Sequence, residues 1–205
     1  FGEGSTLAAP RAAGAAGLTH GVAMTGSTGL IGHAIAARLA AAGHRIVTIG
    51  RHPEAEVRFD LALDRELPRR ALEGCGALVH AAGIIDEDFS DPERAWVKAE
   101  RGTQALLCAA RQAGIARLAY ISSAHVYGPL EGRIDESRAP DPRSDYARAH
   151  LATEQRFAAA AGPAGVSVLI ARPCAAYERP QVSQHLPPRG GEHIRRQPFD
   201  GVASM

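Results

Sequence analysis

The sequence predicts a doubly wound α/β fold, in which helices cover both faces of a parallel sheet to give three layers, α/β/α. Two observations lead to this prediction. From Gly21 onward, short and continuously apolar runs alternate with longer amphipathic stretches, and unbroken apolar runs are typical of parallel strands buried on both faces. In addition, a glycine-rich turn joins the first apolar run to the first amphipathic stretch.

The expected strands are the short apolar runs, and the expected helices are the longer stretches between them. The strands are expected at residues 22–25, 45–49, 57–59, 77–80, 117–122 and 166–171. The helices are expected near residues 30–42, 65–73, 92–113 and 145–161. In the first helix, Ile31, Ile35 and Leu39 recur every four residues and therefore share one face. Gly43 and Gly114 follow two of these helices, at positions where glycine commonly ends a helix.

Composition divides the chain into one folded domain and two irregular ends. Residues 1–20 are expected to form a flexible leader, residues 21–177 the folded domain, and residues 178–205 an irregular tail. The two ends are rich in Ala, Gly, Pro or Arg without any period, so they bury too little apolar surface to offset the entropy of ordering. We therefore expect both ends to be disordered.

Charge and cysteine content argue against several classes of function. The 23 Lys and Arg residues nearly balance 22 Asp and Glu, for a net charge of +1, which argues against binding nucleic acid or a membrane surface through bulk charge. No apolar run reaches the ~18 residues of a transmembrane helix. The three cysteines form no C-x-x-C pair, as is typical of a reducing, cytoplasmic compartment. The histidines and cysteines show no ligand spacing, so we expect no metal site.

A glycine-rich loop is the first candidate binding element. Residues 25–32 read Thr-Gly-Ser-Thr-Gly-Leu-Ile-Gly, between the first strand and the first helix. Glycines at such a junction permit a tight turn and let backbone N–H groups approach a diphosphate, and the helix N-terminus adds partial positive charge. This arrangement predicts a dinucleotide-binding loop. The expected binding residues are Thr25, Gly26, Thr28, Gly29, Leu30, Ile31 and Gly32.

Six landmarks, in order, carry a resemblance to a known family. After the glycine loop come Asp60-Leu61, His80-Ala81-Ala82-Gly83, Gly102-Thr103, the segment Ser-Ser-Ala-His-Val-Tyr-Gly at 122–128, and Arg172-Pro173. Over residues 22–177 the chain resembles the NAD-dependent epimerase/dehydratase family of the extended short-chain dehydrogenase/reductase superfamily. The resemblance implies a Rossmann-like fold that binds NAD(P). It also implies that the chain stops before the family's C-terminal substrate domain, with residues 178–205 as a remnant of that region.

The resemblance assigns further cofactor contacts. They are Asp60, Leu61, Ala81, Ala82, Gly83 and Pro173. Asp60 would contact the adenine amino group, although an aspartate that caps the turn after a strand is an equally good interpretation. In an NAD site, an acidic residue at one further position would bind the 2′-hydroxyl of the adenosine ribose. This chain has Arg51 there. Arg51 would pair with a 2′-phosphate or lie across the adenine, unless it is a solvated loop arginine. On this basis we expect NADP to be preferred.

Two of the family's three catalytic positions match. The resemblance implies that Ser123 hydrogen-bonds the reacting oxygen and that Tyr146 exchanges a proton with it. The lysine expected four residues after the tyrosine is His150, a shorter and mostly neutral side chain. His150 is either a weakened substitute that binds the cofactor ribose, as Tyr146 would, or a polar residue on the helix flank. Lys98, the only lysine, is expected on the helix surface.

The resemblance implies an oxidoreductase that acts on a nucleotide sugar by reversible hydride transfer at a sugar carbon. Two alternatives stay open: a dinucleotide-binding protein without turnover, and a reductase or dehydrogenase for a non-sugar carbonyl compound. A homodimer also stays open. Because the substrate half of the family follows the position of Tyr177, we expect this chain to bind cofactor better than it turns over substrate.

Overall fold

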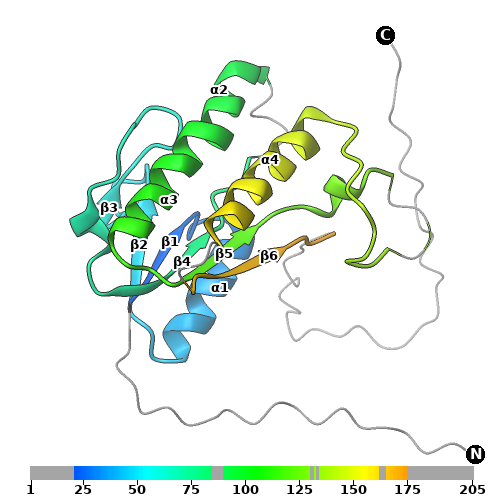
Figure 1. Cartoon of the computed structure of the whole chain (residues 1–205). Helices are drawn as coiled ribbons and strands as arrows, with labels where there is room; N and C mark the ends of the chain where they lie inside the picture. The colour runs from blue at the N-terminus through cyan, green and yellow to red at the C-terminus, as the bar shows by residue number, and fades with distance from the viewer. Residues whose placement is uncertain (1–20, 85–89, 130–131, 133, 162–164, 175–205) are drawn as a thin grey trace, which may run out of the picture.

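The computed structural model describes residues 21–84, 90–129, 132, 134–161 and 165–174. The predicted leader (1–20) and tail (178–205) lie outside these residues. Six parallel strands form one sheet in the order β3-β2-β1-β4-β5-β6 (Figure 1). They are β1 (Gly21–Thr25), β2 (Ile46–Gly50), β3 (Val57–Arg58), β4 (Cys75–His80), β5 (Arg117–Ile121) and β6 (Ser167–Ala171). The predicted strands are confirmed, with small differences at their ends.

The strand order reverses at the centre of the sheet. From β1 the chain moves outward to β2 and β3, then returns to the other side of β1 and moves outward again through β4, β5 and β6. In an open sheet of this kind, the loops at the carboxyl ends of the strands separate at the reversal and leave a crevice. The glycine loop follows β1 and therefore lies at this crevice.

Helices cover the two faces of the sheet as predicted. The main ones are α1 (Leu30–Ala41), α2 (Pro92–Val97), α3 (Thr103–Gln112) and α4 (Asp145–Ala160). α1 packs Ile35 and Leu39 against Met24 on one face. On the other face, α3 and α4 lie side by side (Figure 1) and bury Leu106 and Phe157 in the main core. No helix in the described part of the chain is long and apolar enough to cross a membrane.

The helix predicted over residues 65–73 is wrong. The structure has a single 3₁₀ turn there, η1 (Arg69–Leu72). Pro68 precedes this turn in an extended conformation, and a proline disfavours helical geometry in the residue before it. Leu67 and Leu72 are nevertheless buried in the main core, so the apolar pattern arose from two anchoring side chains and not from a helix face.

The helix predicted over residues 92–113 is confirmed in extent, but it contains an irregular turn. Between α2 and α3, residues Lys98–Gly102 form a π-helical turn, η3. At Gly102 an added Cβ would lie 2.3 Å from the carbonyl oxygen of Leu61. Glycine is therefore needed for the helix to approach the loop after β3 this closely.

A buried polar network fastens α4 to the ends of β5 and β6. Glu154 is 3% exposed, accepts a hydrogen bond from Ser122 Oγ (2.5 Å), and pairs with Arg172 through both carboxylate oxygens (2.9 and 2.5 Å). Arg172 also donates to the hydroxyl of Tyr127 (2.8 Å) and lies over its ring. These bonds hold the loop that contains Ser123 against α4.

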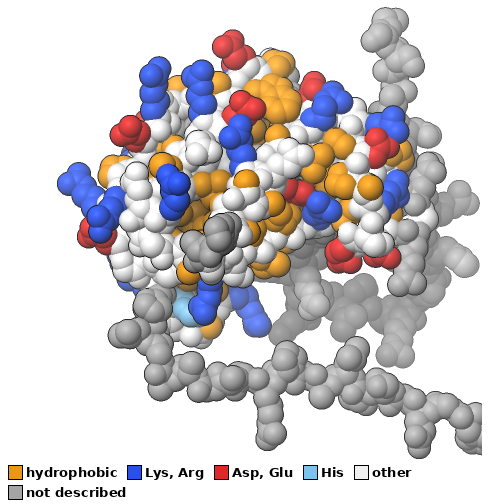
Figure 2. All heavy atoms as spheres, in the orientation of Figure 1, with side chains coloured by type: hydrophobic (Ala, Val, Ile, Leu, Met, Phe, Trp, Pro, Cys, Tyr) orange, Lys and Arg blue, Asp and Glu red, His pale blue; other side chains and the backbone are white. Residues whose placement is uncertain are grey.

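The charges on the face formed by α2, α3 and α4 are mixed. Figure 2 shows basic and acidic side chains interspersed across it, with apolar atoms between them. No single-sign patch dominates this view, in keeping with the balanced composition.

Candidate functional site

A groove of about 890 Å³ runs along the carboxyl ends of β1, β2 and β4. It lies where the strand order reverses. The predicted cofactor residues that line it are Thr25, Gly26, Thr28, Gly29, Arg51, Asp60, Leu61, Ala81, Ala82 and Gly83. Loops from four separate parts of the sequence, predicted to share one binding site, therefore meet in one place.

The three glycines of the loop play different steric roles. Gly26 has a φ of +70°, and an added Cβ would lie 2.4 Å from the carbonyl carbon of Ala81. An added Cβ at Gly32 would lie 2.0 Å from the carbonyl oxygen of Gly26. Gly29, by contrast, meets nothing in the protein closer than 3.5 Å. Gly26 and Gly32 therefore shape the turn, whereas Gly29 leaves room for a ligand to approach the backbone.

The N-terminus of α1 offers hydrogen-bond donors to this space. Gly29 is the N-cap residue of the helix, and no side chain accepts a hydrogen bond from the first turn there. The N–H groups in a first helical turn also have no acceptor within the helix. The N–H groups of Leu30, Ile31 and Gly32 are in that turn. Together with the positive end of the helix dipole, they fit the diphosphate of a dinucleotide.

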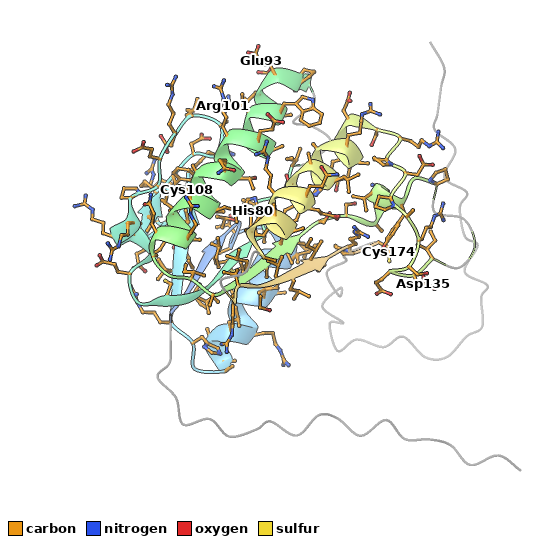
Figure 3. All side chains as sticks on the ribbon, viewed as in Figure 1. His80, Glu93, Arg101, Cys108, Asp135 and Cys174 are labelled. Atoms are coloured by element: carbon orange, nitrogen blue, oxygen red, sulfur yellow. The ribbon has the colours of Figure 1, made fainter. Side chains whose placement is uncertain are left out.

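A buried histidine joins two walls of the groove. His80, at the end of β4, lies deep between the sheet and the helices (Figure 3). Its Nδ1 is 2.7 Å from Thr25 Oγ1, and that hydroxyl also accepts the N–H of Ala82 (3.2 Å). Burial, aided by His150 and Lys98, lowers the pKa of His80 to about 3, so its ring is neutral. Sequence analysis used His80 only as a landmark.

The predicted catalytic residues come from β5 and α4. Ser123 follows β5, and its Oγ accepts the N–H of His125 (3.3 Å). Tyr146, half-buried in the first turn of α4, lies edge-on to His125 and to His150, with ring centroids 5.7 and 4.6 Å apart. Tyr146 thus packs against the loop that begins with Ser123. These catalytic assignments stay predictions.

His150 is buried, with 2% of its surface exposed, and both ring nitrogens have protein partners. Nε2 is 3.2 Å from the carbonyl oxygen of Ile84, which can only accept, so Nε2 carries the proton. Nδ1 lies 2.6 Å from the hydroxyl oxygen of Tyr120 and shares a hydrogen bond with it. Burial raises the pKa of Tyr120 and keeps that hydroxyl protonated. Both ring nitrogens of His150 are therefore engaged by buried protein groups.

Among the described residues, the groove lining does not include His150, Tyr146 or Pro173. Leu30, Ile31 and Gly32 are also absent from this lining. All of the expected cofactor contacts stay predictions. Lys98, by contrast, is half-buried and lines the groove. The expectation that it lies on the helix surface is corrected.

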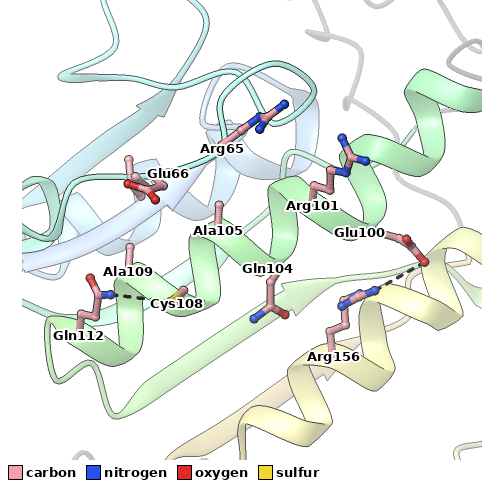
Figure 4. Close-up of a pocket in the computed structure, with 11 residues that line it drawn as sticks. Arg65, Glu66, Glu100, Arg101, Gln104, Ala105, Cys108, Ala109, Gln112 and Arg156 are labelled. Atoms are coloured by element: carbon pink, nitrogen blue, oxygen red, sulfur yellow. Dashed lines mark hydrogen bonds and ion pairs between the residues drawn. The ribbon is translucent and has the colours of Figure 1, made fainter.

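A second groove, of about 650 Å³, crosses the outer face of α3 (Figure 4). Its walls include Arg65, Glu66 and Arg101, and an ion pair between Arg156 and Glu100 (3.5 Å) lies at one side. It contains none of the predicted site residues and lies away from the strand ends. We therefore take the groove at the reversal of strand order as the functional site.

The fold and this groove together define a dinucleotide-binding α/β domain. Residues 22–194 match the model of the NAD dependent epimerase/dehydratase family. The chain belongs to this family. The resemblance found from the sequence motifs is confirmed.

The curated relatives that match the chain have only moderate sequence identity to it. The chain is 31% identical over 163 residues to a UDP-glucose 4-epimerase of Streptomyces lividans, covering 71% of this chain and 50% of that protein. It is 30% identical over 167 residues to a 4-hydroxy-2-methyl-3-oxo-4-farnesyl-3,4-dihydroquinoline-1-oxide ketoreductase of Stigmatella aurantiaca, covering 73% and 48%. The chain thus spans about half the length of these curated relatives.

A similar solved structure is that of a short-chain dehydrogenase/reductase superfamily protein from Agrobacterium tumefaciens with bound NAD. Its TM-score to this chain is 0.67, with 26% sequence identity over 75% of this chain and 48% of that one.

Proposed function

We propose that the chain is the cofactor-binding part of an NAD(P)-dependent epimerase/dehydratase-type enzyme that acts on a nucleotide sugar. The observation that carries this proposal is the groove at the reversal of strand order, with the glycine loop on one wall and the ends of β2 and β4 around it. When bound, NAD(P) supplies a hydride acceptor and donor. The relative from Streptomyces lividans, named a UDP-glucose 4-epimerase, supports a nucleotide sugar as the substrate class.

The cofactor fits what the groove offers. Gly29 leaves space next to the free N–H groups of the first turn of α1, and Asp60 and Arg51 line the end of the groove near β2 and β3. The space at Gly29 and the N–H groups of α1 suit a diphosphate. Asp60 and Arg51 suit an adenosine. We propose that these residues hold the dinucleotide in this order.

The proposed chemistry uses the side chains around α4. As tyrosinate, Tyr146 would take the proton from a sugar hydroxyl while the hydride on the same carbon passes to the bound NAD(P)⁺, and as the phenol it would return the proton in the reverse step. Ser123 donates a hydrogen bond to the same oxygen. His150 is a positioning residue: it contacts the ring of Tyr146 and is itself held by Tyr120 and Ile84.

The test incubates the chain and NAD⁺ or NADP⁺ with a panel of nucleotide sugars, and follows the nicotinamide absorbance together with conversion of the sugar by chromatography, because an epimerase or dehydratase regenerates its oxidised cofactor. Conversion of a nucleotide sugar, or its reduction of the cofactor, supports the proposal. Reduction or oxidation only with non-sugar carbonyl compounds would favour a second candidate, a ketoreductase, which the relative in Stigmatella aurantiaca supports. Cofactor binding without turnover of any compound would favour the non-catalytic alternative.

The choice between NAD and NADP is expected to depend on Arg51. Arg51 is exposed at the groove, where it can reach a 2′-phosphate, but Glu54 lines the same stretch and opposes that charge. Arg51→Ala should weaken NADP(H) binding by about 1–3 kcal/mol, the range of a charge-assisted hydrogen bond, and leave NAD(H) nearly unchanged. Glu54→Ala, the matched control, should strengthen NADP(H). Fluorescence titrations of both cofactors measure the effect, and tighter binding of NAD(H) than of NADP(H) by the wild type would contradict the proposed preference.

His150→Lys is expected to raise turnover. A lysine at this position would bring an ammonium group to within one helical turn of Tyr146, and a nearby positive charge stabilises tyrosinate. A one-unit decrease in the pKa of Tyr146 would correspond to roughly ten-fold more tyrosinate at neutral pH. The pH dependence of absorbance at the tyrosinate band measures this, with Tyr146→Phe in the same background to assign the signal. If neither the titration nor the rate changes, His150 has no influence on Tyr146.

A further inference from the structure

The only lysine of the chain lies in the wall of the groove. Lys98 is half-buried at the junction between α2 and the π-helical turn. It lines the groove together with Arg94, one turn earlier on the same helix. This wall comes from the connection between β4 and β5 and is separate from the glycine loop. The groove therefore has basic side chains on a second element.

The helix that contains Lys98 is held in place at the site. Gly102, at the other end of the π-helical turn, lets the helix approach Leu61, a predicted cofactor contact. Lys98 also lines a small cavity of about 10 Å³ beneath the groove, shared with Leu61, Gly83, Tyr120 and others. Its side chain therefore lies between the groove and the buried polar interior.

Polar groups also line the small cavity that Lys98 borders. The hydroxyl of Thr103 is fully buried at the same cavity and has no hydrogen-bond partner within the described residues. The positive charge of Lys98 contributes to the lowered pKa of His80, the residue that joins the ends of β1 and β4. The ammonium group thus acts electrostatically on the floor of the groove.

No described residue of the neighbouring helix, α4, lines the groove. On α4, the ring nitrogens of His150 are bonded instead to Tyr120 and Ile84. A dinucleotide, however, has a negatively charged diphosphate, and a lysine provides a compact charge with three donors. We propose that Lys98 is a binding residue for the dinucleotide cofactor, supplying positive charge from the α2–α3 helix to a groove that the described residues of α4 do not line. This inference rests on the proposed function.

The first test compares Lys98→Gln with Arg111→Gln, a variant of an exposed arginine at the far end of α3. Lys98→Gln should raise the Kd for NADH on the order of ten-fold, the effect of losing one charge-assisted hydrogen bond. The salt dependence of binding should also become shallower, since screening then acts on one charge fewer. Lys98→Arg should recover part of the affinity. Arg111→Gln should bind as the wild type does.

The second test uses the unaltered chain. Because Lys98 is the only lysine, acylation of lysine side chains by an amine-reactive reagent reports on this residue alone. Saturating NADH should slow its modification several-fold, as followed by mass spectrometry of the peptide. Equal rates with and without NADH, or an unchanged Kd and salt dependence in Lys98→Gln, would overturn the inference about Lys98. Failure of the wild-type chain to bind NADH or NADPH at all would overturn the proposed function as well.

Discussion

Replacing Tyr146 by phenylalanine is expected to lower turnover at least about 100-fold, the lower range for loss of a general acid–base group. The phenol is half-buried in the first turn of α4, in contact with His125 and His150. Phenylalanine keeps this packing and removes only the group that exchanges the proton. Affinity for NAD(H) should change less than about two-fold, because the groove lining does not include Tyr146.

The measurement is hydride transfer with whichever nucleotide sugar proves active in the panel, alongside a cofactor titration of the same variant. Tyr127→Phe is the matched control, since its hydroxyl contacts Arg172 and lies outside the proposed proton path. It should retain turnover. Full activity in Tyr146→Phe would show that another group takes the proton from the substrate.

Replacing Glu154 by glutamine should destabilise the fold by about 3 kcal/mol, the lower end of the cost of breaking a buried ion pair. The carboxylate is almost fully buried, whereas the Arg172 side chain keeps 23% of its surface in solvent. Glutamine is nearly isosteric but leaves the guanidinium without its counter-charge. For a domain of this size the loss corresponds to a decrease in Tm of about 6–12 °C.

Urea unfolding measures the free energy, and Glu100→Gln provides the control. Glu100 also pairs with an arginine, Arg156, but at 3.5 Å and with half its surface exposed. Such surface pairs contribute about 0–1 kcal/mol. Similar losses in the two variants would show that burial of the Glu154 network adds nothing to stability.

The sheet could be predicted well from the sequence because parallel strands that are buried on both faces appear as short, continuous apolar runs. Such runs lack the spacing of apolar residues that is typical of an amphipathic helix. Residues 117–122 illustrate this: the run became β5, and its Ser122 end passes into the loop with Ser123. The glycine loop was equally clear, since the short contacts at Gly26 and Gly32 tolerate no side chain. Both features are local, so the sequence contains the information directly.

The positions of Lys98 and His150 were not predictable in the same way. Lys98 was placed on the surface because lysine is rarely buried, but the groove that it lines is built with segments far away in the sequence, at 25–29 and 48–61. The partner of His150, Tyr120, is 30 residues away in the chain, and no spacing rule connects the two. The helix expected at 65–73 failed for a local reason, because Pro68 interrupts a pattern that otherwise satisfied the helical period.

The parallel pairing of β1 with β4 has a consequence for how the protein acquires its site. The bond between Thr25 and His80 spans 55 residues, and β2, β3 and η1 must all be synthesised before β4 can join β1. To form such a non-local pair, the chain must first lose the conformational entropy of a large loop, before any strand contacts stabilise it. This cost slows folding. On the ribosome, the first half of the chain emerges with one edge of β1 unpaired. Affinity for the dinucleotide therefore arises only when the central strands have met, and bound cofactor then stabilises the completed sheet by mass action.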